Sequence, residues 1–298
     1  MATPSAVSLG SCVSGIPVTL HYSFFLLLLL EFVNAVRLSG TYPMYMLFVA
    51  ALYGPVLLLT IVVHEFGHAL VAKRLGGSVG GIVLWPLGGF ALCGPTEALG
   101  GELKVALAGP ATHVPMGIVW YLVFLVATGG KSGWWPPGTI YLDVLSSGVA
   151  GFFEILSAQA LFMNIALLCF NLFLPAYPLD GGRIYAAGLM LAFKLRGATA
   201  ARVTAVTAMV VSSGMILYAL VGVLYGAAGG ELLLGFVGVY VFYQSYELHV
   251  AARRDDLADH PIFGRECYRG AGGTDGGGGG DGGGPGTAPV PADSAVPA

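Results

Sequence analysis

Six long apolar stretches constrain this chain more than any other feature of its sequence. They cover about residues 18–37, 43–72, 102–127, 150–174, 203–226 and 231–249. A helix needs about 20 apolar residues to cross a membrane, and the second stretch is longer than that. Only 10% of the 298 residues are charged and the mean hydropathy is +0.80, whereas soluble domains are about 25% charged. We therefore expect an all-α polytopic membrane protein with about six transmembrane helices.

The positions of lysine and arginine predict how these spans are oriented. If the spans alternate in direction, eleven basic residues fall on one side of the membrane and two on the other. The larger set is Lys73, Arg74, Lys104, Arg183, Lys194, Arg196, Arg202, Arg253, Arg254, Arg265 and Arg269, and the smaller set is Arg37 and Lys131. Because basic loops stay in the cytoplasm, both termini are predicted to be cytoplasmic. Trp134 and Trp135, on the opposite side, fit an interfacial aromatic belt.

The rest of the composition narrows the class of protein further. A net charge of −3 does not favour nucleic-acid binding. The spacing of the four cysteines indicates neither a disulfide framework nor a cysteine-based metal site. No lysine or arginine precedes Ile16, so we expect the first apolar stretch to be a retained span and not a signal peptide. The C-terminus shows no lipidation or retention motif.

The pentapeptide His64-Glu65-Phe66-Gly67-His68 lies inside the second apolar stretch. In a helix the two histidines share one face, because residues four apart lie one turn above each other. Two imidazoles so placed suit Zn²⁺, and Glu65 beside them is placed to accept a proton from a metal-bound water. The alternative is a chance match with hydrogen-bonded core histidines. Burying an ionisable group at the centre of a bilayer costs about 2.5–3.5 kcal/mol, however, and such groups are usually functional.

A catalytic zinc site usually has three protein ligands, so the motif leaves one to be found. The fourth apolar stretch should end at the same side of the membrane as the two histidines, and Asp180 follows it in Pro178-Leu-Asp-Gly-Gly182. After Glu65, Asp180 is the sole acidic residue that we expect near this depth, apart from Glu154 at the opposite end of the span. We therefore predict Asp180 as the third ligand, and the alternative is an ordinary Asp-Gly turn.

Two further polar residues lie in apolar surroundings. Asn171, near the end of the fourth stretch, is placed to donate a hydrogen bond to a carbonyl oxyanion, or alternatively to a neighbouring helix. His113 follows the small residues Ala108-Gly-Pro110. It can approach the metal, although packing or hydrogen bonding is the interpretation that we favour.

The segment Leu84-Trp-Pro-Leu-Gly-Gly-Phe-Ala-Leu92 is too apolar for a solvated loop and too short to cross a membrane. Its glycines and proline argue against a helix. Irregular backbone at membrane depth is tolerated where it lines a protein cavity, which favours a re-entrant hairpin between helices 2 and 3 over an apolar cytoplasmic loop. We also expect a kink at Gly54-Pro55 and a short interfacial helix over residues 184–196.

Together these motifs resemble the site-2 protease family of intramembrane zinc metalloproteases, in particular its short, six-span archaeal and bacterial type. The matching segments, in order, are Gly15-Ile-Pro-Val-Thr-Leu-His21, His64-Glu-Phe-Gly-His68, Pro86-Leu-Gly-Gly-Phe-Ala91, Ala108-Gly-Pro110 and Asn171-x-x-x-Pro175 with Pro178-Leu-Asp-Gly-Gly182. The resemblance implies one zinc ion held by His64, His68 and Asp180, with Glu65 as general base and Asn171 as an oxyanion or substrate contact. It also implies that the hairpin over 84–92 docks the substrate strand.

Two departures from the family pattern stand out. His113 occupies a position where the family often has a smaller or amide residue. The C-terminal tail lacks the pair of nucleotide-sensing modules that many short members carry, so that mode of regulation is not implied.

The domain organisation that we expect has three parts. They are an N-terminal cytoplasmic segment (1–15), an intramembrane metalloprotease domain (16–250) and a cytoplasmic tail (251–298) that is glycine-rich and disordered from about residue 268.

The function expected from the sequence is an intramembrane zinc endopeptidase. Its partners would be the lipid bilayer and the transmembrane segment of a single-pass protein, whose cleavage releases a cytoplasmic fragment. A metal-ion transporter with an intramembrane His/Asp site is the alternative, because such residues also mark ion pathways. An inactive membrane scaffold is the third class, and the intact Glu65 argues against it.

Overall fold

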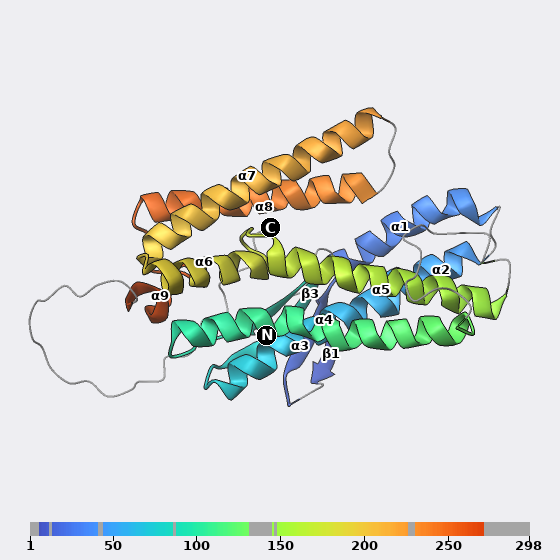
Figure 1. The fold of residues 1–298 in the computed structure, drawn as a ribbon, viewed down its shortest axis with the longest axis horizontal. Helices are drawn as coiled ribbons and strands as arrows, with labels where there is room; N and C mark the ends of the chain where they lie inside the picture. The colour runs from blue at the N-terminus through green and yellow to red at the C-terminus, as the bar shows by residue number, and fades with distance from the viewer. Residues whose placement is uncertain are drawn as a thin grey trace, which may run out of the picture.

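A computed structural model describes residues 6–11, 14–40, 44–85, 88–130, 145, 148–225 and 230–270 of the chain (Figure 1). Its helices are α1 (Ser23–Ser39), α2 (Tyr45–Ala51), the π-helical turn η1 (Leu52–Val56), α3 (Leu57–Arg74), α4 (Leu99–Ala127), α5 (Val149–Phe173), α6 (Asp180–Phe193), α7 (Gly197–Leu224), α8 (Gly230–Arg253) and α9 (Glu266–Gly270). Its strands are β1 (Ala6–Ser11), β2 (Pro17–His21), β3 (Val79–Trp85) and β4 (Gly88–Cys93). The expected aromatic belt at Trp134 and Trp135 lies outside the described residues. So does the glycine-rich tail expected from about residue 268, except for residues 268–270, which belong to α9.

Four helices of the described part are long and apolar enough to cross a membrane. They are Tyr45–Arg74 (α2, η1 and α3 taken together), Leu99–Ala127 (α4), Val149–Phe173 (α5) and Gly197–Leu224 (α7). Helix α1 is apolar but shorter, with 17 residues. Helix α8 has 24 residues, and polar residues in its second half, among them Gln244 and Glu247, lower its mean hydropathy. The chain is thus a largely helical membrane protein, and the count of six spans stays a prediction.

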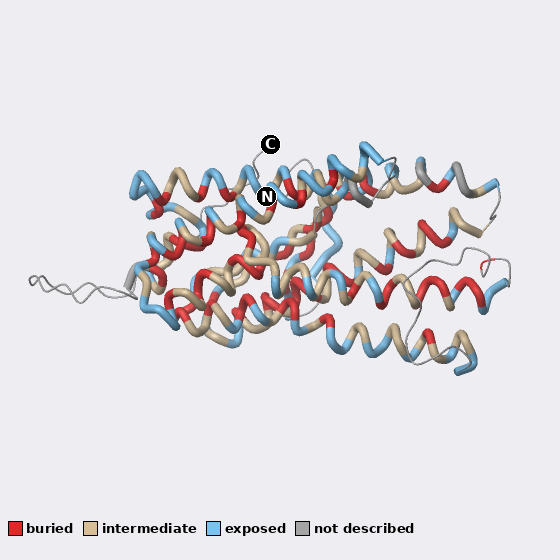
Figure 2. The backbone as a smooth tube through the Cα atoms, turned by 45° about the horizontal axis from the view of Figure 1, so that its top comes forward, coloured by how far each residue is buried: buried red, intermediate tan, exposed pale blue. Residues whose placement is uncertain are grey.

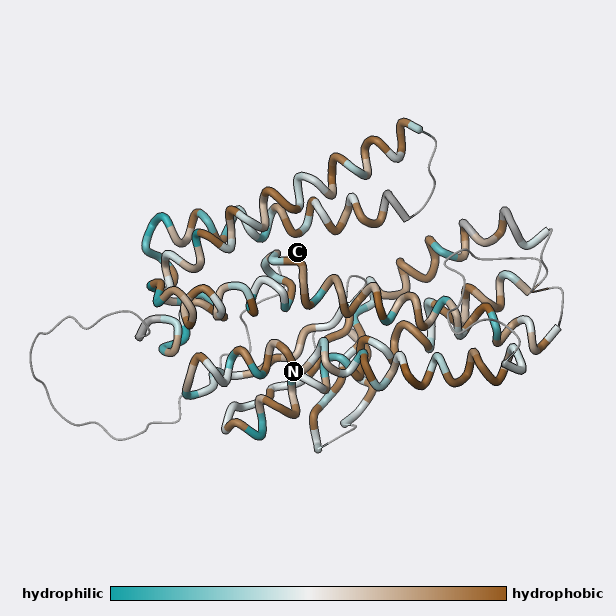
Figure 3. The backbone as a smooth tube through the Cα atoms, viewed as in Figure 1, coloured by the Kyte–Doolittle hydropathy of each residue, from teal (hydrophilic) through white to brown (hydrophobic). Residues whose placement is uncertain are grey.

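The outer surfaces of the helices are apolar, as expected for contact with lipid. On α1, the side chains of Leu26, Leu29 and Leu30 are each more than half exposed, and their spacing places them on one face. Figure 3 shows hydrophobic residues along most of the helices, with hydrophilic residues gathered at the end where α6, α7 and α9 lie. The bundle therefore has one strongly polar end.

The expected all-α fold is wrong in one respect, because the chain also forms a small sheet. Its strand order is β1-β2-β3-β4, with β2 and β3 parallel and the other neighbouring pairs antiparallel. The predicted hairpin over 84–92 corresponds to β3 and β4, although residues 86–87 at its turn lie outside the described part. Strand β1 lies within the expected N-terminal segment 1–15 and pairs with β2 of the expected domain.

Helix α3 lies between this sheet and α4. On one side, Val18, Leu20, Ile82 and Leu84 of the sheet form an apolar cluster with residues of α3 such as Ala69. On the other side, α4 approaches so closely that a Cβ on Gly67 would lie 2.6 Å from the carbonyl oxygen of Ala108. Figure 2 shows that buried residues occur along most of the elements, whereas several helix ends are exposed. Two rigid neighbours therefore fix the position of α3.

Local features of the helices largely follow the sequence. Gly54 and Pro55 lie in η1, a π-helical turn between α2 and α3. Proline has no backbone N–H to donate, and the π-helical turn replaces the α-helical hydrogen-bond pattern at this point, so the helix continues past Pro55. The short helix expected over 184–196 is α6, and it begins earlier, at Asp180. This earlier start places Asp180 at the first position of a helix.

Candidate metal centre

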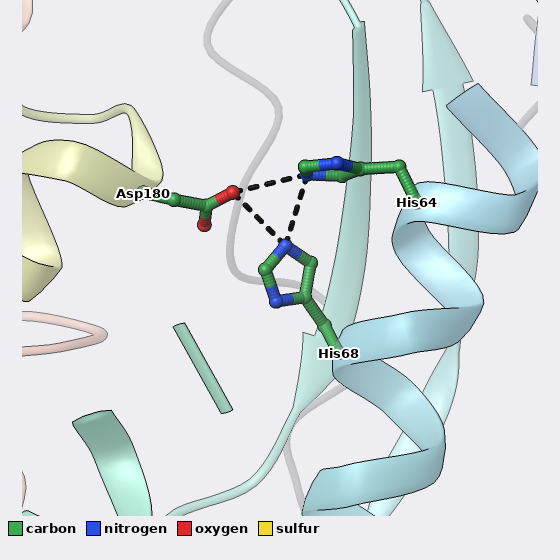
Figure 4. A group of neighbouring side chains, drawn as sticks. All are labelled: His64, His68 and Asp180. Atoms are coloured by element: carbon green, nitrogen blue, oxygen red, sulfur yellow. Dashed lines mark hydrogen bonds and ion pairs between the residues drawn. The ribbon is translucent and has the colours of Figure 1, made fainter. Parts of the chain in front are cut away.

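The two histidines of the pentapeptide point from α3 toward the first residue of α6 (Figure 4). The Nε2 atoms of His64 and His68 lie 3.1 Å apart, and Asp180 Oδ2 lies 3.0 Å from each of them. All three residues are buried. The structure thus brings together the three residues that the sequence predicted as ligands, and they form the one such group of potential metal ligands among the described residues.

The donor set fits a zinc ion. Ligand atoms around tetrahedral zinc, at bond lengths of about 2.0–2.1 Å, lie about 3.3 Å apart, close to the separations of 3.0–3.1 Å between these three atoms. Space for an ion is kept by Gly109 of α4. A Cβ at this position would lie 2.1 Å from His68 Nε2 and 2.7 Å from His64 Nε2. A side chain there would occupy the space between the ligand atoms.

Each histidine has a partner at its other ring nitrogen. His68 Nδ1 lies 2.6 Å from the carbonyl oxygen of Val105, which can only accept, so this nitrogen carries the proton and Nε2 is free to bind a metal. His64 Nδ1 lies 3.0 Å from Nε2 of His113, whose Nδ1 lies 3.1 Å from Oδ1 of Asn164. If His64 binds a metal through Nε2, its Nδ1 carries the proton and would donate to Nε2 of His113, whose Nδ1–H would then donate to Oδ1 of Asn164.

His113 therefore contacts a predicted ligand and is not itself part of the three-residue group. This agrees with the hydrogen-bonding role favoured from the sequence. Asn164 was missed. It is a polar amide in an apolar helix, seven residues before Asn171 and so on a similar face of α5, which is a signal that the sequence contained.

The second carboxylate oxygen of Asp180 forms an ion pair with Arg183. Arg183 Nη1 lies 3.6 Å from Asp180 Oδ1, and Arg183 Nη2 lies 3.8 Å from Oε2 of Glu102. Glu102 is a further buried acidic residue near Asp180 that we did not expect from the sequence. It is only 1% exposed and shares Arg183 with Asp180. Its charge is offset by Arg183 and by Arg265 from the C-terminal part of the chain. No local sequence pattern indicates this long-range pairing.

Glu65 is buried next to the two histidines on α3. Its Oε2 accepts a hydrogen bond of 2.9 Å from the backbone N–H of Ala91 in β4. The strand lies so close that a Cβ on Gly89 would be 2.4 Å from Glu65 Cγ. Strand β4 therefore covers the predicted base directly.

Asn171, the other predicted catalytic residue, lies half-buried near the end of α5. It is not among the three grouped ligands, and no hydrogen bond joins its side chain to another residue in the described part of the chain. Its predicted role is neither supported nor contradicted by this geometry.

A helical membrane protein with such a site belongs to the class of membrane-embedded metallopeptidases of the His-Glu-x-x-His type. Comparison with known proteins agrees. The model of peptidase family M50 matches residues 54–218, more than half of the chain, and the chain belongs to this family. The resemblance drawn from the motifs is thereby confirmed.

Individual relatives extend the similarity beyond the matched region. The chain is 29% identical over 233 residues to "Zinc metalloprotease MJ0392" of Methanocaldococcus jannaschii, covering 78% of this chain and 57% of that protein. It is 31% identical over 252 residues to Rip3 of Mycobacterium tuberculosis, covering 80% of this chain and 57% of Rip3. The chain therefore spans little more than half the length of these two relatives.

Proposed function

We propose that this chain is an intramembrane zinc endopeptidase that cleaves a transmembrane segment of single-pass proteins and releases a cytoplasmic fragment. The observation that carries the proposal is that Asp180 of α6 meets His64 and His68 beside Glu65. The two histidines and Glu65 lie on a helix long and apolar enough to cross a membrane. Membership of peptidase family M50 supports peptide hydrolysis over other metal chemistry.

His64, His68 and Asp180 would hold the ion, which when bound supplies Lewis acidity toward the scissile carbonyl and the attacking water. Glu65 accepts the proton of the water and returns it to the leaving amine. Burial of Glu65 next to the histidines supports this role, because the carboxylate lies close to the ligands without being one of the three. Asn171, whose side-chain amide has no partner among the described residues, is proposed to donate a hydrogen bond to the oxyanion.

The substrate must be extended where it is cut, because a helix keeps its carbonyl groups in its own hydrogen bonds. We propose β4 as the edge that docks it. Strand β4 is the last strand of the sheet, and its contact with Glu65 supports this placement. The same contact supports a re-entrant position of the β3–β4 hairpin, because it brings the strand to the level of a residue inside α3.

The rival function is transport of a metal ion, for which the same three residues would be ligands along a pathway. Glu65 distinguishes the two functions. Glu65→Gln keeps the shape of the side chain and removes the proton acceptor. A protease should retain its zinc and lose at least about 10²-fold in cleavage, the usual contribution of a general base.

The test uses a reporter single-pass segment in liposomes, with wild type and Glu65→Gln compared at equal zinc content. Equal cleavage by the two proteins would exclude Glu65 as the base. Zinc flux through the wild type without cleavage would favour the transporter.

A further inference from the structure

The residues that follow α8 form a compact element of the bundle. We call residues 254–270 the C-terminal segment. Within it Ile262, Phe263 and Tyr268 are 6%, 2% and 1% exposed and belong to an apolar cluster that includes residues of α6, α7 and α8. The segment approaches α7 so closely that a Cβ on Gly197 would lie 2.1 Å from the carbonyl oxygen of Tyr268. Figure 1 shows its last helix, α9, beside α6 and the start of α7.

One side chain of this segment reaches toward the metal centre. The Nη1 of Arg265 donates to Oε2 of Glu102 at the start of α4, and its Nη2 donates to the carbonyl oxygen of Cys93 at the end of β4, at 2.8 Å. Its Nε donates to Pro261 of the same segment, at 2.9 Å. Arg265 therefore ties the C-terminal segment both to α4 and to the strand that covers Glu65.

The partner of Arg265 is also connected to a predicted metal ligand. Glu102 Oε1 accepts two hydrogen bonds of 2.9 Å from Thr96, and Oε2 faces both arginines. Arg183 lies 3.8 Å from Glu102 and 3.6 Å from Asp180, separations that are ion pairs but too long for hydrogen bonds. Arg183 is thus shared by two carboxylates, whereas Arg265 bonds Glu102 directly.

We propose that Arg265 is a positioning residue of the metal centre. By neutralising Glu102 it leaves Arg183 beside Asp180, so that metal binding depends on the docked C-terminal segment. Without Arg265 the buried Glu102 would keep one cationic partner and draw Arg183 toward itself, because an unpaired buried charge is strongly unfavourable. Asp180 would then lose the group that orients its second oxygen. The inference rests on the proposed function only in taking His64, His68 and Asp180 as metal ligands.

The experiment measures the zinc affinity of the purified full chain by competition with a chromophoric chelator. In Arg265→Met, which keeps the apolar stem and removes the charge, affinity should fall about 10–100-fold, the usual cost of losing an outer partner of a ligand. Adding Glu102→Gln should restore affinity to near the wild-type value, because the carboxylate that draws Arg183 away is gone. Arg265→Lys, which keeps the charge, should bind zinc more tightly than Arg265→Met. Arg254→Ala is the matched control, because Arg254 is an exposed arginine of the same segment, and it should change nothing.

A second measurement is the visible absorption spectrum of the Co²⁺-loaded protein, which reports the geometry of the ligands. The spectrum should change in Arg265→Met and recover in the variant that also carries Glu102→Gln. Wild-type affinity in Arg265→Met would overturn the inference. So would a loss that Glu102→Gln fails to restore, because it would indicate general damage to the fold. Cleavage is not measured, so a wild type that binds zinc without cleaving would contradict the proposed function alone. A wild type that binds no zinc would overturn both.

Discussion

The three predicted ligands differ in the group that contacts the atom facing away from the metal position. His68 donates to the carbonyl of Val105, which no substitution removes. His64 depends on the side chain of His113, and Asp180 depends on Arg183. A ligand's outer partner fixes its orientation and, for histidine, its tautomer. The partners of His64 and Asp180 are side chains, so their effect on metal binding can be tested by mutation.

Gly109→Ala should abolish zinc binding while leaving the fold intact. The added Cβ would lie 2.1 Å from His68 Nε2, so the ring must leave the site. Elsewhere in a helix the same change usually stabilises by about 0.4–1 kcal/mol. Gly117→Ala on α4 is the matched control, because its Cβ would meet only Leu161 Cδ1, at 3.6 Å. Metal content measured on both purified variants tests this, and near-stoichiometric zinc in Gly109→Ala would contradict it.

His113→Leu should lower zinc affinity about 10–100-fold, because the buried Nδ1–H of His64 loses its acceptor. His113→Gln should recover part of the affinity, since an amide oxygen accepts the same hydrogen bond. Asn164→Leu, one step further from the metal, should have a smaller effect than His113→Leu. Chelator competition on the three variants gives the order, and an unchanged affinity in His113→Leu would remove His113 from the site.

Residue chemistry explains why the sequence revealed some of this site and not the rest. His64 and His68 lie one helical turn apart and sit in an apolar stretch, so their spacing alone predicts a shared face. Asp180 followed from topology. Glu102 and Arg265 are 163 residues apart in the chain, and nothing in their neighbouring residues indicates that they meet.

At the scale of secondary-structure elements, the metal centre depends on neighbours that lie far apart in the chain. Strand β4 and helix α4 enclose α3, and the C-terminal segment closes the cluster beside α6. The sheet was only half predicted. The β3–β4 hairpin was expected from its glycines and proline, whereas β1 and β2 form only because they pair with each other and β2 pairs with β3.

Docking of the C-terminal segment should weaken as the pH falls from about 6.5 toward 4. His260 Nδ1 accepts from the N–H groups of Ile262 and Phe263, at 3.2 and 3.1 Å, which only an unprotonated nitrogen can do. Burial and the neighbouring positive charge of Arg265 lower the pKa of His260 from 6.5 to about 4. The Tyr177 ring, 5.5 Å away, is uncharged at these pH values. The docked form binds fewer protons than the released form, so its stabilisation is complete above pH 6.5 and is lost below.

Hydrogen exchange of residues 257–268, corrected for intrinsic rates, measures this release. Protection should fall between pH 7 and pH 5 in the wild type. His260→Asn should remove the dependence, because its Oδ1 accepts the same two hydrogen bonds and does not titrate. Equal loss of protection in both proteins would show that another group is responsible.

At the scale of the whole molecule, the orientation of α1 and α8 decides where the two termini lie. Both helices fall outside the four that are long and apolar enough to be counted as spans. Two hydrogen bonds at their ends lead to a prediction for both helices. Lys73 Nζ, at the end of α3, donates to the carbonyl of Ser14, and Arg202 Nε, near the start of α7, donates to the carbonyl of Ala252 at the end of α8. If α3 and α7 cross the membrane, these contacts return both ends of the chain to the side that carries Lys73 and Arg202.

Labelling of single cysteines tests this arrangement in a chain whose four native cysteines have been replaced. A membrane-impermeant maleimide should label Lys131→Cys in intact cells, and should label Ser8→Cys, Arg196→Cys and Ser294→Cys only in inverted vesicles, as the excess of basic residues on that side requires. Arg196, between α6 and α7, is the internal reference for the cytoplasmic side. Ser294→Cys labelled from outside would mean that α8 does not cross, because α7 alone then separates it from Arg196. Ser8→Cys labelled from outside would likewise mean that α1 does not cross the membrane. It would also contradict the pairing of β1 with the sheet that covers Glu65.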